Sequence, residues 1–103
     1  MPTIPDLLRL LEREPNDAFV LYGLAQEYAK AKDTAKAVEY YDRCLAADPT
    51  YVYAYYHKAR AMQAAGRVTD AADVVRAGIT ASRAAGDHHA VAELSSLQDE
   101  FED

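Results

Sequence analysis

Apolar residues recur along this chain at intervals of three and four, the spacing that places them on one face of an α-helix. The clearest series occupy positions 21, 24, 25 and 28 and positions 55, 59 and 62. Residues 51–55 alternate tyrosine with small apolar residues as a half-buried strand does, and tyrosine and valine favour strands. Tyr55 nevertheless belongs to the second helical series, and Tyr53, Tyr56 and Arg60 form another helical stripe. The pattern therefore predicts a helix across this segment.

Residues that begin and end helices stand between these series. Pro5 suits a first helical turn, and Gly66 and Gly86 stand where helices should end. The residues at positions suited to an N-cap are Asp17, Asp33, Thr50 and Asp87. Together these signals predict about six helices joined by short turns, at residues 5–14, 18–31, 34–47, 51–65, 69–85 and 88–101.

The apolar series repeats at an offset of 34 residues. Leu21, Ala25, Tyr28, Ala37, Tyr41, Cys44 and Leu45 correspond in order to Tyr55, Ala59, Met62, Ala71, Val75, Gly78 and Ile79. Read backward, the offset places Pro49, Leu45, Cys44 and Tyr41 on Pro15, Leu11, Leu10 and Leu7. We therefore expect a half repeat at 1–15, whole repeats at 18–49 and 52–83, and a capping helix with an acidic tail at 87–103.

The repeated unit resembles the tetratricopeptide repeat (TPR). Leu21-x2-Leu24-Ala25-x2-Tyr28, then Ala37-x3-Tyr41 and Pro49, matches that family's W-x2-L-G-x2-Y, A-x3-F and P pattern, with leucine for tryptophan, alanine for glycine and tyrosine for phenylalanine. The second unit is looser, with Lys58 at a leucine position and Arg83 at the proline position. The resemblance implies an all-α fold: a TPR-like α-solenoid of antiparallel helix pairs in a right-handed superhelical stack, forming a single domain over residues 1–103.

Several positions are expected to form the core. Tyr28 and Tyr41 are bulky where space between helices must be filled, and Cys44 is expected to be a buried thiol. Gly78 inside a helix costs about 1 kcal/mol relative to alanine, which indicates that another helix crosses there. The apolar stripe of the last helix is formed by Val91, Leu94, Leu97 and Phe101. This stripe is typical of a terminal helix that covers the last repeat.

The resemblance implies that the first helix of each unit lines the inner face of the superhelix. The residues opposite the core stripes of these helices are Phe19, Tyr22, Gln26 and Lys30 in the first unit and Tyr53, Tyr56, His57 and Arg60 in the second. Four are aromatic, and aromatic and arginine residues are enriched in binding hot spots. We therefore expect a scaffold protein that binds a peptide or protein segment on this aromatic face, with a few acidic groups of the partner meeting Lys30 and Arg60.

Two alternatives remain for this face. Single exposed tyrosines are common and need no explanation, and the same aromatic residues are also suited to join two copies of the chain in a structural homodimer. TPR domains that bind the C-terminal carboxylate of chaperones resemble one another in a Lys and Asn clamp. Tyr22, Gln26 and His57 stand at the corresponding positions, so a chaperone-tail adaptor is disfavoured. The tail sequence DEFED at 99–103 is a further hypothetical ligand, docking on a neighbouring molecule near Lys30 and Arg60.

Charge and hydropathy exclude several classes of partner. The net charge is −6, and residues 87–103 hold six acids and no Lys or Arg. No concentrated basic surface is available to neutralise phosphates, so we expect no nucleic acid partner. The apolar runs are too short to cross a bilayer. No basic leader precedes the first apolar stretch, so we expect no signal peptide and a cytoplasmic protein.

The sequence offers little to build a reactive centre. Cys44 is the only cysteine, which excludes an internal disulfide and any CxxC motif. The neighbouring His88 and His89 point about 100° apart on a helix, and only Glu93 stands at a spacing suited to join them, so we expect no metal site. Glycine-rich phosphate loops and nucleophile–base arrangements are absent. We expect neither an enzyme nor a cofactor.

Overall fold

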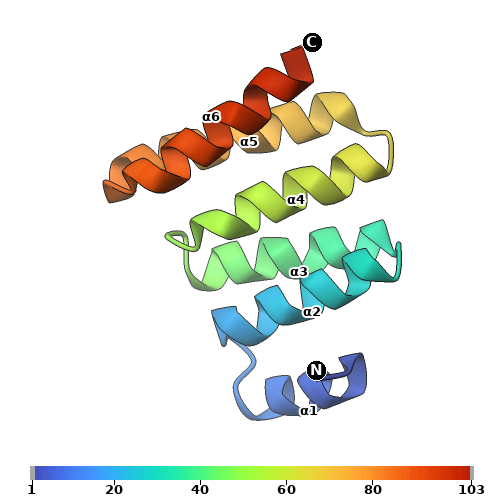
Figure 1. Ribbon diagram of the computed structural model, residues 1–103. Helices are drawn as coiled ribbons and strands as arrows, with labels where there is room; N and C mark the ends of the chain where they lie inside the picture. The colour runs from blue at the N-terminus through green and yellow to red at the C-terminus, as the bar shows by residue number, and fades with distance from the viewer. Residues whose placement is uncertain (1, 103) are drawn as a thin grey trace. The chain divides into compact units, whose positions relative to one another are not determined.

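The protein is built from α-helices. The computed structural model describes residues 2–102, and within that range it contains six α-helices and no β-strand. The helices are α1 (Ile4–Arg13), α2 (Ala18–Lys30), α3 (Thr34–Ala47), α4 (Val52–Ala64), α5 (Val68–Ala85) and α6 (His88–Glu102) (Figure 1). Every predicted helix is present, and each predicted end lies within one residue of the observed one. The all-α fold is thus confirmed.

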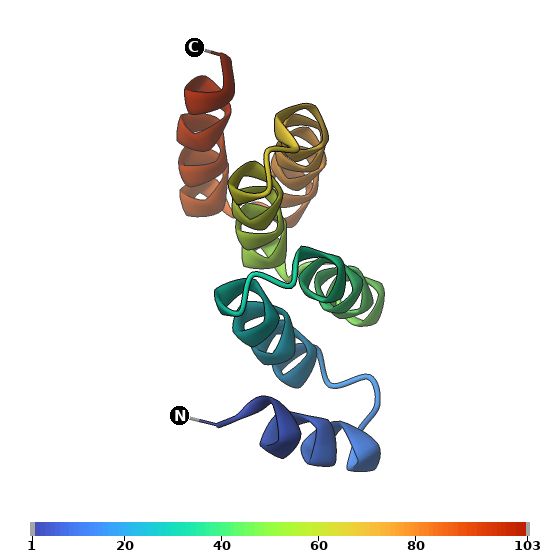
Figure 2. The same cartoon turned by 90° about the vertical axis from the view of Figure 1, so that its right-hand side faces the viewer.

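The chain divides into two compact units, one ending at Pro49 and the other beginning at Thr50. In the first unit α2 and α3 form an antiparallel pair, and α1 packs against α2. In the second unit α4 and α5 form a similar pair, and α6 packs along α5 and also contacts α4 (Figure 2). The division falls between the two predicted whole repeats.

Short polar side chains begin the helices of the first unit. Asp17 accepts hydrogen bonds from the backbone N–H groups of Phe19 and Val20, at 3.0 and 3.2 Å. Asp33 accepts one from the N–H of the third helical residue of α3, at 3.1 Å. Both predicted N-caps are therefore confirmed. The sequence analysis missed the N-cap of α1, where Thr3 and Asp6 form a capping box.

The core of the first unit lies between α2 and α3. Leu21, Leu24, Ala25, Ala37, Tyr41 and Cys44 are at most 1% exposed. Tyr28 is only half-buried, and its ring stacks on that of Tyr40, with ring centroids 5.5 Å apart. The repeat register placed Leu10 at a core position, which is wrong, because Leu10 is 50% exposed. Within this unit α1 packs on α2 alone, and it does so through Leu7 and Leu11.

In the second unit, α4 and α5 begin without a side-chain cap, and glycines stand at or just after their C-terminal ends. Gly66 follows α4 and Gly86 ends α5, with φ angles of 81° and 70°, so both predicted stops are confirmed. The side chain of Asp87 caps α6 by accepting a hydrogen bond from the N–H of Ala90 at 3.0 Å. The prediction of Thr50 as an N-cap is wrong, because the N-cap of α4 is Tyr51.

Helices of the second unit approach one another closely at Gly78 of α5. A Cβ atom added to Gly78 would lie 2.7 Å from the Cβ of Tyr55 on α4 and 3.2 Å from Cδ1 of Leu94 on α6. This proximity confirms that other helices cross α5 there. Leu94 and Leu97 of the predicted capping stripe are 1% exposed, whereas the end residues of that stripe are half-buried.

Candidate protein-binding surfaces

The first group of predicted binding residues lies on α2. Phe19 is 74% exposed, more than either of the other exposed large apolar residues among residues 2–102, Leu10 and Val68. Three of the four predicted residues, Phe19, Gln26 and Lys30, line a pocket of about 250 Å³. The other residues that line this pocket are Pro2, Leu7, Gly23 and Glu27. The structure thus brings an exposed aromatic ring, an amide and an ammonium group to one hollow beside α1.

Tyr22, the fourth residue, lies against the core instead of in this pocket. Its ring meets the buried Tyr41 ring edge-on, with centroids 6.1 Å apart. The Tyr41 hydroxyl donates a hydrogen bond to Oε1 of Gln26. Burial, and next the neighbouring Tyr22, raise the pKa of Tyr41 well above its usual range, so the hydroxyl stays protonated as a donor. Gln26 therefore keeps its oxygen toward the core, while the residue also lines the pocket.

Lys30 has an intramolecular partner one turn earlier in α2. Its Nζ lies 3.0 Å from Oε2 of Glu27, and the Lys30 side chain is 62% exposed. The Glu27 side chain is only 24% exposed, so the ammonium group lies at the surface while its carboxylate partner is largely buried.

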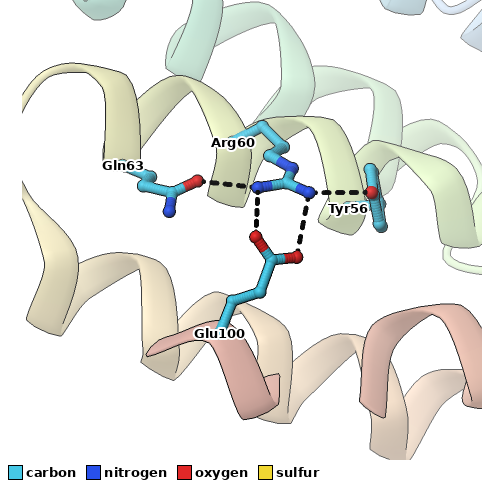
Figure 3. Close-up of polar contacts among 4 residues, drawn as sticks. All are labelled: Tyr56, Arg60, Gln63 and Glu100. Atoms are coloured by element: carbon cyan, nitrogen blue, oxygen red, sulfur yellow. Dashed lines mark hydrogen bonds and ion pairs between the residues drawn. The ribbon is translucent and has the colours of Figure 1, made fainter. Parts of the chain in front are cut away.

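The second group lies on α4, and its basic residue is already bound to a carboxylate. Arg60 donates from Nη1 to Oε1 of Glu100 at 3.2 Å and from Nη2 to Oε2 at 3.1 Å (Figure 3). Arg60 Nη1 also donates to Oε1 of Gln63 at 3.0 Å, and Nη2 to the hydroxyl of Tyr56 at 3.3 Å. The Arg60 guanidinium lies 5.5 Å from the centroid of the Tyr56 ring, within cation–π range. The acid that meets Arg60 in this structure is Glu100 of α6 in the same chain. The acidic partner that the sequence analysis expected at Arg60 stays a prediction.

The remaining residues of this group also face α6. Tyr53 is half-buried, and burial followed by Glu93 and Asp87 raises its pKa, with Glu93 accepting a hydrogen bond from its hydroxyl. Burial, and next Arg60, lower the pKa of His57, and Glu93 opposes them. The acidic residues of α6 thus lie beside the stripe that the sequence analysis treated as open.

Sequence reasoning did not identify Glu93 and Glu100 as members of this surface. A signal for them exists in the sequence, because residues seven apart lie on the same face of a helix. Glu93 also contacts His89, whose Nε2 lies 2.5 Å from its Oε1. Nothing in the sequence alone shows that this acidic face meets α4.

Potential metal ligands and the Cys44 thiol are the other chemically reactive groups of the described residues. Among residues 2–102, His, Cys, Asp and Glu side chains form no group of three or more that could hold a metal ion. Cys44 is fully buried, and burial followed by Asp48 raises the pKa of its thiol to about 11, so it is almost entirely protonated at neutral pH. In this part of the chain, every helix is too short or too polar to span a bilayer.

Other proteins are similar to this chain in sequence or in the arrangement of their helices. A tetratricopeptide repeat domain protein from Salinibacter ruber is 31% identical, with a TM-score of 0.78 over 86% of this chain and 90% of that chain. This chain belongs to the tetratricopeptide repeat family. A TPR repeat-containing protein of Pseudomonas aeruginosa is 29% identical over 89% of this TPR chain and 88% of its own length.

A solved structure of lower sequence identity shares the TPR fold, and a family model matches much of the chain. The TPR2B domain of yeast Sti1, in a complex with pHsp70, is 22% identical and has a TM-score of 0.87 over 96% of this chain and 79% of that chain. The family described as N-terminal acetyltransferase A, auxiliary subunit, matches residues 9–81. These residues run from α1 into α5, so the match covers the helices of both repeats and ends before α6.

Proposed function

We propose that this TPR protein is a non-catalytic scaffold that binds a peptide or protein segment through the first helix of each repeat. The observation that carries the proposal is the pocket beside Phe19, which combines a large exposed aromatic ring with the Gln26 amide and the Lys30 ammonium group. The yeast Sti1 domain of the same fold was solved with pHsp70 bound, which supports protein binding as the use made of this fold.

The size of the pocket favours a side chain of a partner over a free small molecule. Pockets for drug-sized ligands usually enclose about 300–1,000 Å³, whereas this one encloses about 250 Å³. Gly23 also lines the pocket, and an added Cβ there would stand 3.7 Å from both methyl groups of Leu7, at ordinary van der Waals contact. An apolar or aromatic side chain fits against Phe19, while Lys30 and the Gln26 NH2 group bind polar or acidic neighbours.

Residues of α4 extend the proposal to the second unit. Tyr53, Tyr56, His57 and Arg60 are each partly exposed. Tyrosine and arginine are among the residues enriched in binding hot spots, since each combines a large contact area with polar groups. The role of all eight residues in binding a partner is part of this proposal.

Peptide-display selection with the intact protein tests the proposed function. The selected peptide is then titrated against the wild-type chain and against the Phe19→Ala variant. We expect Phe19→Ala to weaken binding by about 2 kcal/mol, roughly thirtyfold, as for other hot-spot aromatic residues. Its melting temperature should not change, because the ring is 74% exposed.

Leu10→Ala is the matched control, because Leu10 is a second large apolar side chain in the same unit, 50% exposed and outside the pocket. Equal losses in the two variants, or unchanged affinity after Phe19→Ala, would contradict the proposal. Light scattering over a range of concentrations separates the homodimer alternative. If the wild-type chain forms a dimer and the Phe19→Ala variant is a monomer, the pocket binds a second copy of the chain.

A further inference from the structure

The carboxylate site at Arg60 is built by α4 alone. Gln63 and Tyr56 lie three residues after and four residues before Arg60, so both stand beside it on the helix surface. Their oxygens fix the guanidinium from two sides, while Glu100 takes both ends of its fork (Figure 3). Paired N–H donors of this kind match the two oxygens of a carboxylate. The contacts that Arg60 makes with Gln63 and Tyr56 therefore involve α4 alone and do not include Glu100.

Glu100 is held much less firmly than the helix that carries it. Leu94 and Leu97 fix α6 and are 1% exposed, but Glu100 lies beyond them and its side chain is 52% exposed. The Arg60 side chain is 38% exposed, so water and solutes reach the contact. Acidic residues in the last turn of a helix are also opposed by the helix dipole.

We propose that Arg60 is a binding site for a carboxylate of an acidic protein segment, and that Glu100 is its built-in competitor. This inference rests on the proposed protein-binding function and names the chemistry of the partner at one point of the surface. In the isolated chain the α6 carboxylate occupies the site. A partner binds by replacing it with a carboxylate of its own, without displacing the buried leucines of α6.

The chain itself supplies a probe of known chemistry. The acetylated peptide SSLQDEFED, residues 95–103, carries the carboxylate found at Arg60. We would titrate it into the full-length protein and follow the NMR signals of α4 residues, which report both weak binding and folding. An exposed ion pair competes only weakly, so Glu100→Gln should tighten peptide binding about two- to fivefold relative to wild type.

Asp99→Asn is the matched control, because it removes the same charge from the neighbouring residue without vacating the Arg60 site. If Asp99→Asn tightened binding as much as Glu100→Gln, the gain would come from lower repulsion and the proposal would fail. A second arm adds Arg60→Lys or Arg60→Gln to the Glu100→Gln chain. Either substitution at Arg60 should abolish the tighter peptide binding that Glu100→Gln produces. Glutamine lacks the charge, and lysine keeps the charge but lacks the paired N–H donors of the guanidinium.

Two further outcomes are decisive. Absence of α4 shifts in the Glu100→Gln protein at millimolar peptide overturns the inference, even if the Phe19 pocket binds a selected peptide. In the opposite case, the peptide shifts α4 signals as expected but Phe19→Ala does not weaken binding of the selected peptide. That result overturns the proposed function at the Phe19 pocket and leaves the carboxylate site at Arg60 supported. A C-terminally amidated peptide distinguishes an acidic side chain from a terminal carboxylate as the ligand.

Discussion

At the scale of single residues, two glycines inside helices meet different surroundings. Gly78 has Tyr55 so near that an added Cβ would lie 2.7 Å from the Cβ of that residue, an atom close to the α4 backbone. Gly23 has only the methyl groups of Leu7 within reach, at 3.7 Å. Glycine costs about 1 kcal/mol relative to alanine in a helix, so only a packing requirement justifies it. That requirement exists at Gly78 and not at Gly23.

We therefore predict opposite effects of one substitution at the two sites. Gly78→Ala should destabilise the protein by about 1–3 kcal/mol, because overpacking outweighs the better helix propensity. Gly23→Ala should stabilise it by up to about 1 kcal/mol. Urea unfolding followed by circular dichroism measures both values. A stabilised Gly78→Ala protein would show that α4 and α5 move apart without cost.

At the scale of elements, α6 contributes buried surface to the second unit. Leu94 and Leu97 are 1% exposed and Ala90 is equally buried, and Leu94 lies at the crossing beside Gly78. Without α6, the face of α5 that carries Ile79 would meet water. The helix thus covers part of α4 and α5 within this unit, and we predict that it acts as a capping helix.

A chain that ends at Gly86 should melt at a much lower temperature or fail to fold. Burial of each leucine contributes about 1.5–3 kcal/mol, a large share of the 5–15 kcal/mol typical of a domain. Thermal melting by circular dichroism, with light scattering for aggregation, measures the loss. A chain ending at Phe101 is the control, since it keeps the buried leucines and lacks two acids. Equal melting of the Gly86 chain and the full chain would refute the capping role.

At the scale of the whole molecule, two buried groups, the Cys44 thiol and the Tyr41 hydroxyl, make the free energy of unfolding vary with pH in the alkaline range. Burial raises the pKa of Cys44 from 9.0 to about 11 and that of Tyr41 from 10.0 to a still higher value. Above pH 9 the folded chain thus retains protons that the unfolded chain releases. The stabilisation is complete below pH 9 and is lost as the pH rises toward the folded-state values.

We predict that the free energy of unfolding falls from about pH 9 upward, with Cys44 responsible for on the order of 2 kcal/mol by pH 11. Urea unfolding at a series of pH values measures the slope. Cys44→Ala should flatten the slope between pH 9 and 10, where Tyr41 contributes little, whatever its effect at pH 7. The same slope in the wild type and in Cys44→Ala would show that the thiol ionises without cost in the folded state.

Much of the fold is already present in the sequence, because helix formation is local. Spacings of three and four set the helices, and Asp17, Asp33 and Gly86 marked ends that the structure confirms. The 34-residue offset identified the family, since each repeat must present the same small and large residues to its neighbours. Burial was less predictable where neighbours are missing. Leu10 has the repeat's core spacing, yet only α2 packs on α1 in this unit.

The candidate site divides along the same line. The sequence by itself determined which residues are chemically suited to bind a partner, among them Phe19 and Arg60, because helical periodicity separates them from the core stripes. Only the tertiary structure decided what those residues touch. Arg60 and Glu100 are 40 positions apart, and their pairing follows from the packing of α6 on α4 and α5. Such a contact depends on how two helices dock, which local spacing does not encode.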